Sequence, residues 1–272
     1  MHISREYLLY IVWTLVMPPH ASAVSEMEPG QQEQHRLFVV FNNVLYRAGL
    51  ATGWGFACLI EGGGNTVLFD TGGDGAVLLS NMQHMGLDPH AVEAVVLSHN
   101  HGDHTGGLEA FLAGNPDVTV YIPASFPAAF RQQVMQLGAD IESVSGPRRL
   151  LDGVHSTGEM NHGIREQALI VDTPQGLIVI TGCAHPDVAD MAAQAKAYLG
   201  KDIYLLMGGF HLGGRSEADI RAIIQRLQAL GVRKVAPSHC TGDRALRLFR
   251  EAWKDDFIEG GLGAVIAVPG KR

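Results

Sequence analysis

Four side chains that could bind a metal stand between positions 99 and 104: His99, His101, Asp103 and His104. They follow directly on an apolar, β-branched segment at residues 95–97 and precede glycines that mark a tight loop entering a helix. Imidazole nitrogens combined with a carboxylate oxygen are the ligand set of zinc, and also of iron and manganese. On an extended segment His99 and His101 point to the same side. The spacing therefore predicts a metal site rather than a chance cluster of surface histidines.

Three further turns carry a histidine directly after an apolar run that reads as a strand. They contain Cys183 and His185, then His211, and finally His239 with Cys240. Loops that follow strands gather at one edge of the sheet in open α/β folds, and these folds place their sites there. One histidine in a turn is usually structural, but four such turns indicate a shared site. We expect His185 and His239 to bind metal, and His211 either to bind metal or to face a substrate.

The three cysteines are odd in number and too few for a disulfide framework. Cys58 lies in a strand-like run and is expected to be a buried apolar residue. Cys183 has two interpretations, because its thiolate could bind or bridge zinc, or the residue could simply pack beneath the site. Cys240 adjoins an expected ligand and is interpreted as structural.

The elements that must position these turns can be predicted from apolar periodicity. Strands are expected at residues 36–46, 56–60, 66–69, 92–97, 118–122, 168–171, 177–180, 203–207, 232–236 and 264–268. Helices are expected at residues 75–85, 108–113, 126–137, 187–199, 216–230 and 243–253. Asp70 ends the third strand beside glycines, so it either hydrogen-bonds a ligand histidine or lies in a solvated turn. No low-complexity linker interrupts the chain, which predicts one domain over residues 24–272, built from two similar α/β halves.

Composition and the first residues limit the setting in which the protein works. The 272-residue chain is 46% hydrophobic, carries a formal charge of −8 and has no basic block, which argues against a nucleic-acid surface. Residues 8–17 form an apolar run too short to span a bilayer, and Ala21 and Ala23 have the small-residue form of a cleavage site. Residues 1–23 are therefore predicted to be a signal peptide, which implies a periplasmic or secreted protein without a membrane span. If they are not cleaved, because the start codon is mis-chosen or the segment is an anchor, the protein is expected in the cytoplasm.

The His-x-His-x-Asp-His loop, with the strand before it, resembles the signature of the metallo-β-lactamase superfamily. Residues 68–72, 97–108, 180–186, 208–212 and 237–242 further resemble a branch of metal-dependent hydrolases described as 7,8-dihydropterin-6-yl-methyl-4-(β-D-ribofuranosyl)aminobenzene 5′-phosphate synthase. The resemblance covers residues 37–269. It implies an αββα sandwich, with two mixed sheets face to face, helices outside and two metals at the sheet edge.

The resemblance also assigns ligands. His99 and His101 would bind one metal, whereas Asp103 and His104 would bind a second, completed by His239. At the position of the superfamily's bridging aspartate this chain has Cys183. The superfamily's usual third histidine has no clear counterpart in this chain. By position the candidate is His162, but His185, two residues after Cys183, is the preferred substitute. One or two divalent ions are expected, Zn²⁺ foremost, with Mn²⁺ or iron also compatible with these ligands.

The leading hypothesis for function is a metal-dependent hydrolase acting on a small-molecule ester, lactone, thioester or phosphoester. Asp103 would orient the attacking water, and His211 would contact a substrate oxyanion or leaving group. The alternative is a synthase-type transferase that condenses a dihydropterin diphosphate with an aminobenzene ribotide, although such substrates are cytosolic. A di-iron redox protein is a distant third hypothesis. Such a protein needs an acidic third ligand and usually a flavin partner, and the sequence shows neither. The sequence indicates no particular oligomeric state.

Overall fold

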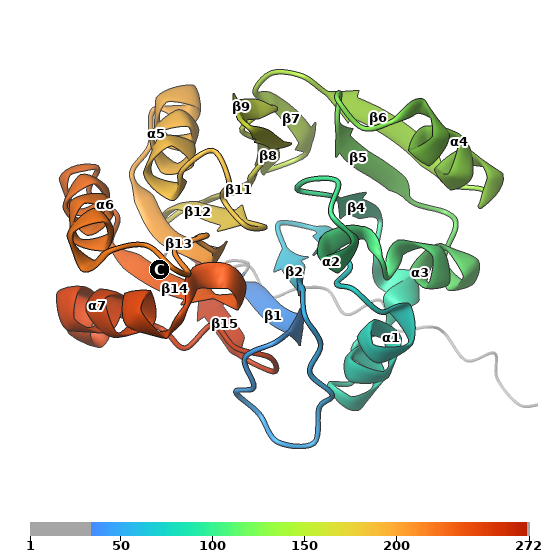
Figure 1. Cartoon of the computed structure of the whole chain (residues 1–272). Coiled ribbons are helices and arrows are strands. Elements are labelled where there is room, and N and C mark those ends of the chain that lie inside the picture. Colours follow the sequence, from blue (N-terminus) through green and yellow to red (C-terminus); the bar gives the residue numbers. More distant parts are fainter. Residues whose placement is uncertain (1–33, 271–272) are drawn as a thin grey trace, which may run out of the picture. The chain divides into compact units, whose positions relative to one another are not determined.

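Two β-sheets form the framework of residues 34–270, the part of the chain that the computed structural model describes (Figure 1). The predicted signal peptide, residues 1–23, lies outside these described residues. The first sheet has seven strands in the order β15-β1-β2-β3-β4-β5-β6. In chain order they are β1 (His35–Asn42), β2 (Phe56–Gly62), β3 (Asn65–Phe69), β4 (Ala94–Val96), β5 (Thr119–Pro123), β6 (Asp140–Val144) and β15 (Val265–Val268). Strands β3 to β6 run parallel to one another, and the remaining pairs are antiparallel.

The second sheet has six strands in the order β14-β13-β12-β11-β8-β7. They are β7 (Arg148–Leu151), β8 (Val154–Ser156), β11 (Leu169–Thr173), β12 (Gly176–Thr181), β13 (Ile203–Gly209) and β14 (Lys234–Ser238). Strands β12, β13 and β14 are parallel, so their carboxyl ends meet at one edge of the sheet. A separate two-stranded ribbon is formed by β9 (Met160–His162) and β10 (Ile164–Glu166).

Side chains on the inner faces of the two sheets pack against each other. Because successive residues of a strand point to opposite faces, Ile178 and Ile180 of β12 join the core between the sheets, together with Leu37 and Val39 of β1. Leu177 and Val179 of the same strand face the helices instead. Cys58 of β2 belongs to the core between the sheets, which agrees with its prediction as a buried apolar residue.

Helices cover the outer face of each sheet, and Figure 1 shows the two sets on opposite sides. The first sheet is covered by α1 (Gly75–His84), α3 (Leu108–Gly114) and α4 (Ala128–Gln136). The second is covered by α5 (Val188–Leu199), α6 (Glu217–Ala229) and α7 (Asp243–Trp253). The order of layers is helix, sheet, sheet, helix, which confirms the predicted αββα sandwich.

Local sequence explains where these elements begin and end. Helix α6 buries Ile220, Ile223, Ile224 and Leu227 on one face, and the Ser216 side chain accepts from the Asp219 backbone N–H at its start. Strand β1 ends at Asn42, earlier than predicted, because its side-chain carbonyl accepts the Val44 N–H at 3.0 Å and turns the chain. The short helices η1 (Pro89–Ala91), α2 (Gly102–Thr105), η2 (His239–Thr241) and η3 (Lys254–Asp256) were not predicted.

None of the described helices combines the length and apolar composition needed to cross a bilayer.

Candidate metal centre

The loop after β4 brings His99 and His101 together with His185, which follows β12. One ring nitrogen from each of these three residues lies within 4.8 Å of the other two. Nε2 of His99 is 3.1 Å from Nδ1 of His101. The structure thus places His185, and not only the two histidines of the loop, in a three-nitrogen group. The side chain of His162, the alternative by position, lies outside what the structure describes.

Asp103, His104, Cys183 and His239 form a second group, whose ligand atoms also lie within 4.8 Å of one another. The Asp103 carboxylate oxygen Oδ2 is 3.5 Å from Nε2 of His104 and 3.4 Å from Nε2 of His239. The Cys183 sulfur is 3.3 Å from Nε2 of His104, so this cysteine directs its thiol into the group. Two nitrogens, one carboxylate and one sulfur make a four-donor set of the kind that zinc accepts.

The two groups adjoin each other. The rings of His99 and His104, one from each group, have centroids only 4.2 Å apart. The rings of His101 and His185 lie 5.1 Å apart within the first group, and those of His104 and His239 lie 5.1 Å apart within the second. The seven side chains therefore form a single centre with two compartments. The loops after β4, β12 and β14 contribute these side chains.

Asp70, at the end of β3, anchors the outer side of the loop. Its Oδ2 accepts from Nδ1 of His104 at 2.7 Å, and its carboxylate also accepts the Ser98 backbone N–H and hydroxyl, each at 2.7 Å. The Ser98 hydroxyl has one hydrogen and gives it to Asp70, so it accepts from Nδ1 of His99 at 2.8 Å. With Nδ1 engaged in both rings, Nε2 of His99 and of His104 is the atom left to hold a cation.

Glu166, the last residue of β10, performs the same task for His185. Its Oε2 accepts from Nδ1 of His185 at 2.9 Å and lies 3.9 Å from Nδ1 of His99. It is fully buried and also accepts the backbone N–H groups of three consecutive residues, Cys183, Ala184 and His185. One carboxylate therefore fixes both the turn that presents Cys183 and the ring of His185.

Asn43, just after β1, orients His239. Its amide nitrogen donates to the His239 carbonyl at 3.3 Å, so its Oδ1 is the atom that faces Nδ1 of the ring, at 2.7 Å. The ring must then donate from Nδ1 and direct Nε2 into the centre. Nε2 of His239 is buried and has no hydrogen-bond partner. A buried polar atom without a partner is costly, and a bound cation would satisfy it.

Ionisation in the second compartment favours a cation. Burial raises the pKa of the Asp103 carboxyl, but the favourable interactions with the rings of His104 and His239 outweigh this and hold that pKa well below its usual range. Burial alone would lower the pKa of His104, yet the neighbouring carboxylates of Asp70 and Asp103 raise it to about 10. Without metal, a proton on His104 therefore occupies the place between ring and carboxylate that a cation would take.

Ionisation in the first compartment favours neutral imidazole ligands. Burial lowers the pKa of His99 to about 2, although the Glu166 charge opposes this effect. Burial also lowers the pKa of His101, assisted by the neighbouring His185. Burial raises the pKa of Glu166, but its electrostatic interaction with His99 and the hydrogen bonds from His185 and the 184–185 backbone bring it well below its usual range. An ionised carboxylate behind neutral imidazoles is the arrangement that metal-binding histidines commonly have.

Several residues of the centre hold a backbone conformation that non-glycine residues rarely adopt. Asp70, Ala184, His211 and His239 have φ values of 56°, 61°, 49° and 52°. Such conformations cost of the order of 1–3 kcal/mol each and persist where the surrounding structure imposes them. The concentration of these conformations in the turns of the centre indicates that the surrounding structure holds the turns so that the candidate ligands keep their positions.

His211 lies beside the centre, outside both groups. Its backbone follows β13, its ring centroid is 4.5 Å from that of His185, and it is exposed to solvent. One of its ring nitrogens lies within 4.8 Å of the sulfurs of Cys183 and Cys240. The ring of His211 is thus open to solvent beside the centre, and Cys240, interpreted from the sequence as structural, lies next to it.

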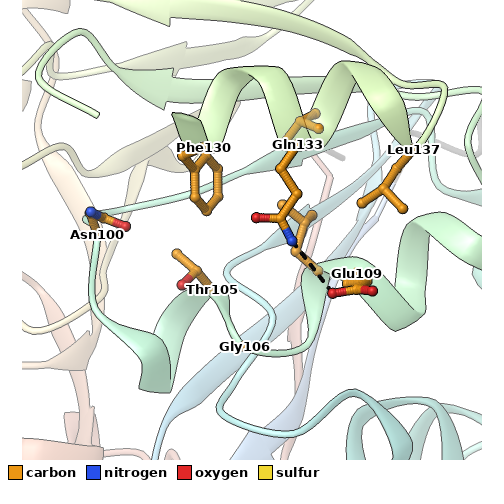
Figure 2. Close-up of a pocket in the computed structure, with 9 residues that line it drawn as sticks. Asn100, Thr105, Gly106, Glu109, Phe130, Gln133 and Leu137 are labelled. Atoms are coloured by element: carbon orange, nitrogen blue, oxygen red, sulfur yellow. Dashed lines mark hydrogen bonds between the residues drawn. The ribbon is translucent and has the colours of Figure 1, made fainter. Parts of the chain in front are cut away.

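A pocket of about 300 Å³ lies behind the metal-binding loop, between α4 and the segment from α2 to α3 (Figure 2). Asn100 and Thr105 line it from the loop, and Phe130 and Gln133 line it from α4. The described residues around it include none of the candidate ligands. Asn100 lines the pocket, whereas its neighbours His99 and His101 bring ring nitrogens into the metal centre, so the pocket is separate from the centre.

Ser98, Glu166 and Asn43 support the centre but were not identified in the sequence. Ser98 adjoins the motif, and Asn43 interrupts an apolar run, so each carried a weak signal. Glu166 carried none, because an isolated acid in a region without periodicity resembles any solvated residue.

Comparison with known proteins identifies the family and the fold. The sequence profile of the Metallo-beta-lactamase superfamily matches residues 55–190. A 7,8-dihydropterin-6-methyl-4-(beta-D-ribofuranosyl)-aminobenzene-5′-phosphate synthase from Methanocaldococcus jannaschii is 29% identical over 261 residues, which cover 79% of this chain and 89% of the relative. The crystal structure of Tm1679, a metal-dependent hydrolase of the beta-lactamase superfamily, superposes with a TM-score of 0.75 at 25% identity, covering 86% of this chain and 99% of that one. The short form of human tRNase Z shares the fold, with a TM-score of 0.60 at 14% identity over 86% of this chain and 99% of its own. This chain belongs to the metallo-β-lactamase superfamily.

Proposed function

We propose that the protein is a zinc-class, metal-dependent hydrolase with a two-compartment metal centre. The observation that carries the proposal is the shared orientation of four histidines, whose outer nitrogens meet Ser98, Asp70, Glu166 and Asn43 and whose inner nitrogens converge. Histidines on a protein surface do not usually have their outer ring nitrogens held by buried polar groups in this way. The unpartnered Nε2 of His239 supports the same conclusion.

The ligands divide between the compartments. We assign His99, His101 and His185 to the first ion, and Asp103, His104, Cys183 and His239 to the second. A zinc-class ion bound there lowers the pKa of a water molecule to about 7 and polarises the bond to be broken. Mn²⁺ or iron fits the nitrogen and oxygen donors, but the Cys183 sulfur favours zinc.

Asp103 and His211 are the residues assigned to act on water and substrate. The Asp103 side chain is 21% exposed, whereas those of His104 and His239 are fully buried, so Asp103 lies on the solvent side of its group. Its carboxylate is ionised and can accept a hydrogen bond from an attacking water and hold it in position. His211 is exposed beside His185 and can donate a hydrogen bond to a developing oxyanion or to the leaving group.

The proposed substrates are small esters, lactones, thioesters or phosphoesters. The experiment uses the purified protein reconstituted with zinc and a panel of one chromogenic substrate from each class. We expect turnover in at least one class, abolished in the His101→Ala variant and restored after chelation only when metal is returned. Absence of turnover throughout the panel, with variant and wild type alike, would overturn the hydrolase proposal.

A synthase-type transferase is the second candidate, and the 29% identity with the archaeal synthase favours it. Its assay supplies a dihydropterin diphosphate and the aminobenzene ribotide and measures pyrophosphate release that depends on both substrates. Cleavage after residue 23 would separate the enzyme from cytosolic substrates of this kind. Mass spectrometry of the mature N-terminus in the native host therefore bears on the choice, because an intact Met1 removes this objection and also contradicts export.

A further inference from the structure

Cys183 and Cys240 lie side by side although they are 57 positions apart in the chain. Cys183 follows β12, and Cys240 lies in η2 after β14. The Cys240 sulfur is 3.7 Å from the Cys183 carbonyl oxygen, and the two sulfurs lie within 4.8 Å of each other. Both thiols are free. The pair is thus within reach of a covalent bond.

A glycine, which has no side chain, lies against both cysteines. Gly209 of β13 lies against both residues, because a Cβ atom added there would be 2.8 Å from the Cys240 sulfur and 3.2 Å from the Cys183 Cα. A disulfide has an S–S length of about 2.05 Å. The two sulfurs must therefore approach each other from within 4.8 Å, and rotation about the Cα–Cβ bond of either residue moves its sulfur. Cys58 is fully buried between the sheets and takes no part in the pair.

We propose that Cys183 and Cys240 are an oxidant-responsive dithiol that forms a reversible disulfide with a peroxide-class oxidant. Cys240 is half-buried whereas Cys183 is buried, so peroxide meets Cys240 first. The Cys240 sulfur attacks one peroxide oxygen, the O–O bond breaks, and one water leaves as a sulfenic acid forms. The Cys183 sulfur then attacks the sulfenic sulfur and displaces the second water. Overall, two thiols and one hydrogen peroxide give one disulfide and two waters.

Disulfide formation would remove a ligand from one compartment and not from the other. Cys183 is the sulfur donor of the group that contains Asp103, His104 and His239, and a disulfide sulfur is no longer a thiolate ligand. The group of His99, His101 and His185 contains no sulfur. Oxidation is therefore expected to weaken metal binding in the second compartment alone. This consequence rests on the proposed metal centre, whereas formation of the disulfide does not.

The experiment treats the full-length protein, both zinc-loaded and chelated, with hydrogen peroxide and then digests it without reduction. We expect a Cys183–Cys240 cross-linked peptide, lighter than the separate peptides by about two mass units. The reactive thiols in the denatured protein should fall from three to one. Dithiothreitol should restore all three. Zinc should slow the reaction, because it holds the Cys183 sulfur.

Two variants make the result specific. The Cys58→Ser variant should still form the cross-link, whereas Cys240→Ser should not, and the zinc content of the latter should no longer depend on peroxide. Recovery of Cys183 and Cys240 as separate sulfinic acids, or a disulfide that joins two chains through Cys240, would overturn the dithiol proposal. A correct cross-link with no loss of zinc would leave the dithiol in place and instead contradict Cys183 as a ligand.

Discussion

Glu166 receives two hydrogen bonds from His185 on one carboxylate oxygen, each 2.9 Å long, from the backbone N–H and from Nδ1 of the ring. Its other oxygen accepts the backbone N–H groups of Cys183 and Ala184. A single buried side chain thus determines the path of the turn and the direction of the ring. Asp70 likewise accepts from the ring of His104 in the other compartment, and the backbone N–H that it accepts is that of Ser98.

Replacement of Glu166 by Gln is predicted to empty the first compartment before the second, because His185 loses its ring partner whereas the second group keeps Asp103, His104 and His239 beside the shifted Cys183 turn. A carboxamide can accept on one side only, so its NH₂ group would oppose donors that the carboxylate now satisfies, at a cost of about 1–3 kcal/mol. Loss of a supporting partner typically weakens metal affinity by about 10- to 100-fold. We expect bound zinc to fall by about half in plasma emission measurements. Anomalous diffraction should show the remaining ion between Asp103 and His239.

Asp70→Asn is the matched replacement for the second compartment. Asp70 accepts from the Ser98 hydroxyl, the Ser98 backbone and the ring of His104, and an amide cannot accept all three. Zinc should therefore be lost first from the side of His104, whose ring bonds Asp70 directly, whereas His99 is reached only through the Ser98 hydroxyl. If both replacements removed the same ion first, the division into two compartments would be wrong.

The sequence was sufficient to predict the fold and the ligands of the 99–104 loop, but not the residues that support the ligands. Alternating apolar strands, and helices such as α6 with its stripe of isoleucines, appear directly in the sequence because burial imposes a period on it. The candidate ligands of one loop were recognisable because they lie close together in the sequence with a typical metal-ligand spacing. They are His99, His101, Asp103 and His104. Glu166 was not recognisable, because what distinguishes it is its burial and its four donors, which only the tertiary structure creates. His185 was expected as a ligand because its turn follows an apolar strand, but its grouping with His99 and His101 depends on the tertiary structure.

Asn43→Ala is predicted to weaken metal binding at His239 without unfolding the chain. The replacement removes the acceptor on Nδ1, so the ring of His239 can rotate or exchange tautomers, and Nε2 loses its fixed direction. We expect zinc affinity of the second compartment to fall about 10-fold or more, measured by competition with a chromophoric chelator. Asn43→Asp keeps the acceptor for Nδ1 but loses the donor to the His239 carbonyl, so it should retain more affinity than the alanine variant and less than wild type. Equal affinities for the alanine variant and wild type would contradict the orienting role.

Removal of metal is predicted to lower thermal stability. A ligand that binds only the folded state adds about 2.7 kcal/mol at a concentration of 100 times its dissociation constant. For a chain of this size, that corresponds to a fall of about 5–10 °C in Tm after chelation, measured by calorimetry. His101→Ala should show a smaller fall than wild type, since one compartment is already weakened. A Tm unaffected by chelator and by added zinc would contradict the assigned centre.

Two glycines of the metal-binding loop should respond in opposite ways to replacement by alanine. A Cβ added to Gly107 would lie 2.1 Å from the carbonyl oxygen of Thr71, and Thr71 itself holds the His104 carbonyl through its N–H and hydroxyl. Backbone would have to move, so we expect Gly107→Ala to lose about 2–4 kcal/mol of unfolding free energy and much of its bound zinc.

Gly102 provides the control for that replacement because it lies in the same loop and begins the short helix α2. A Cβ there meets no atom within 4 Å, and alanine favours a helix over glycine by about 1 kcal/mol. Gly102→Ala should therefore match or slightly exceed wild type in chemical denaturation and keep its zinc. If the two variants lost stability equally, general intolerance of the loop, and not the contact between Gly107 and Thr71, would be the cause.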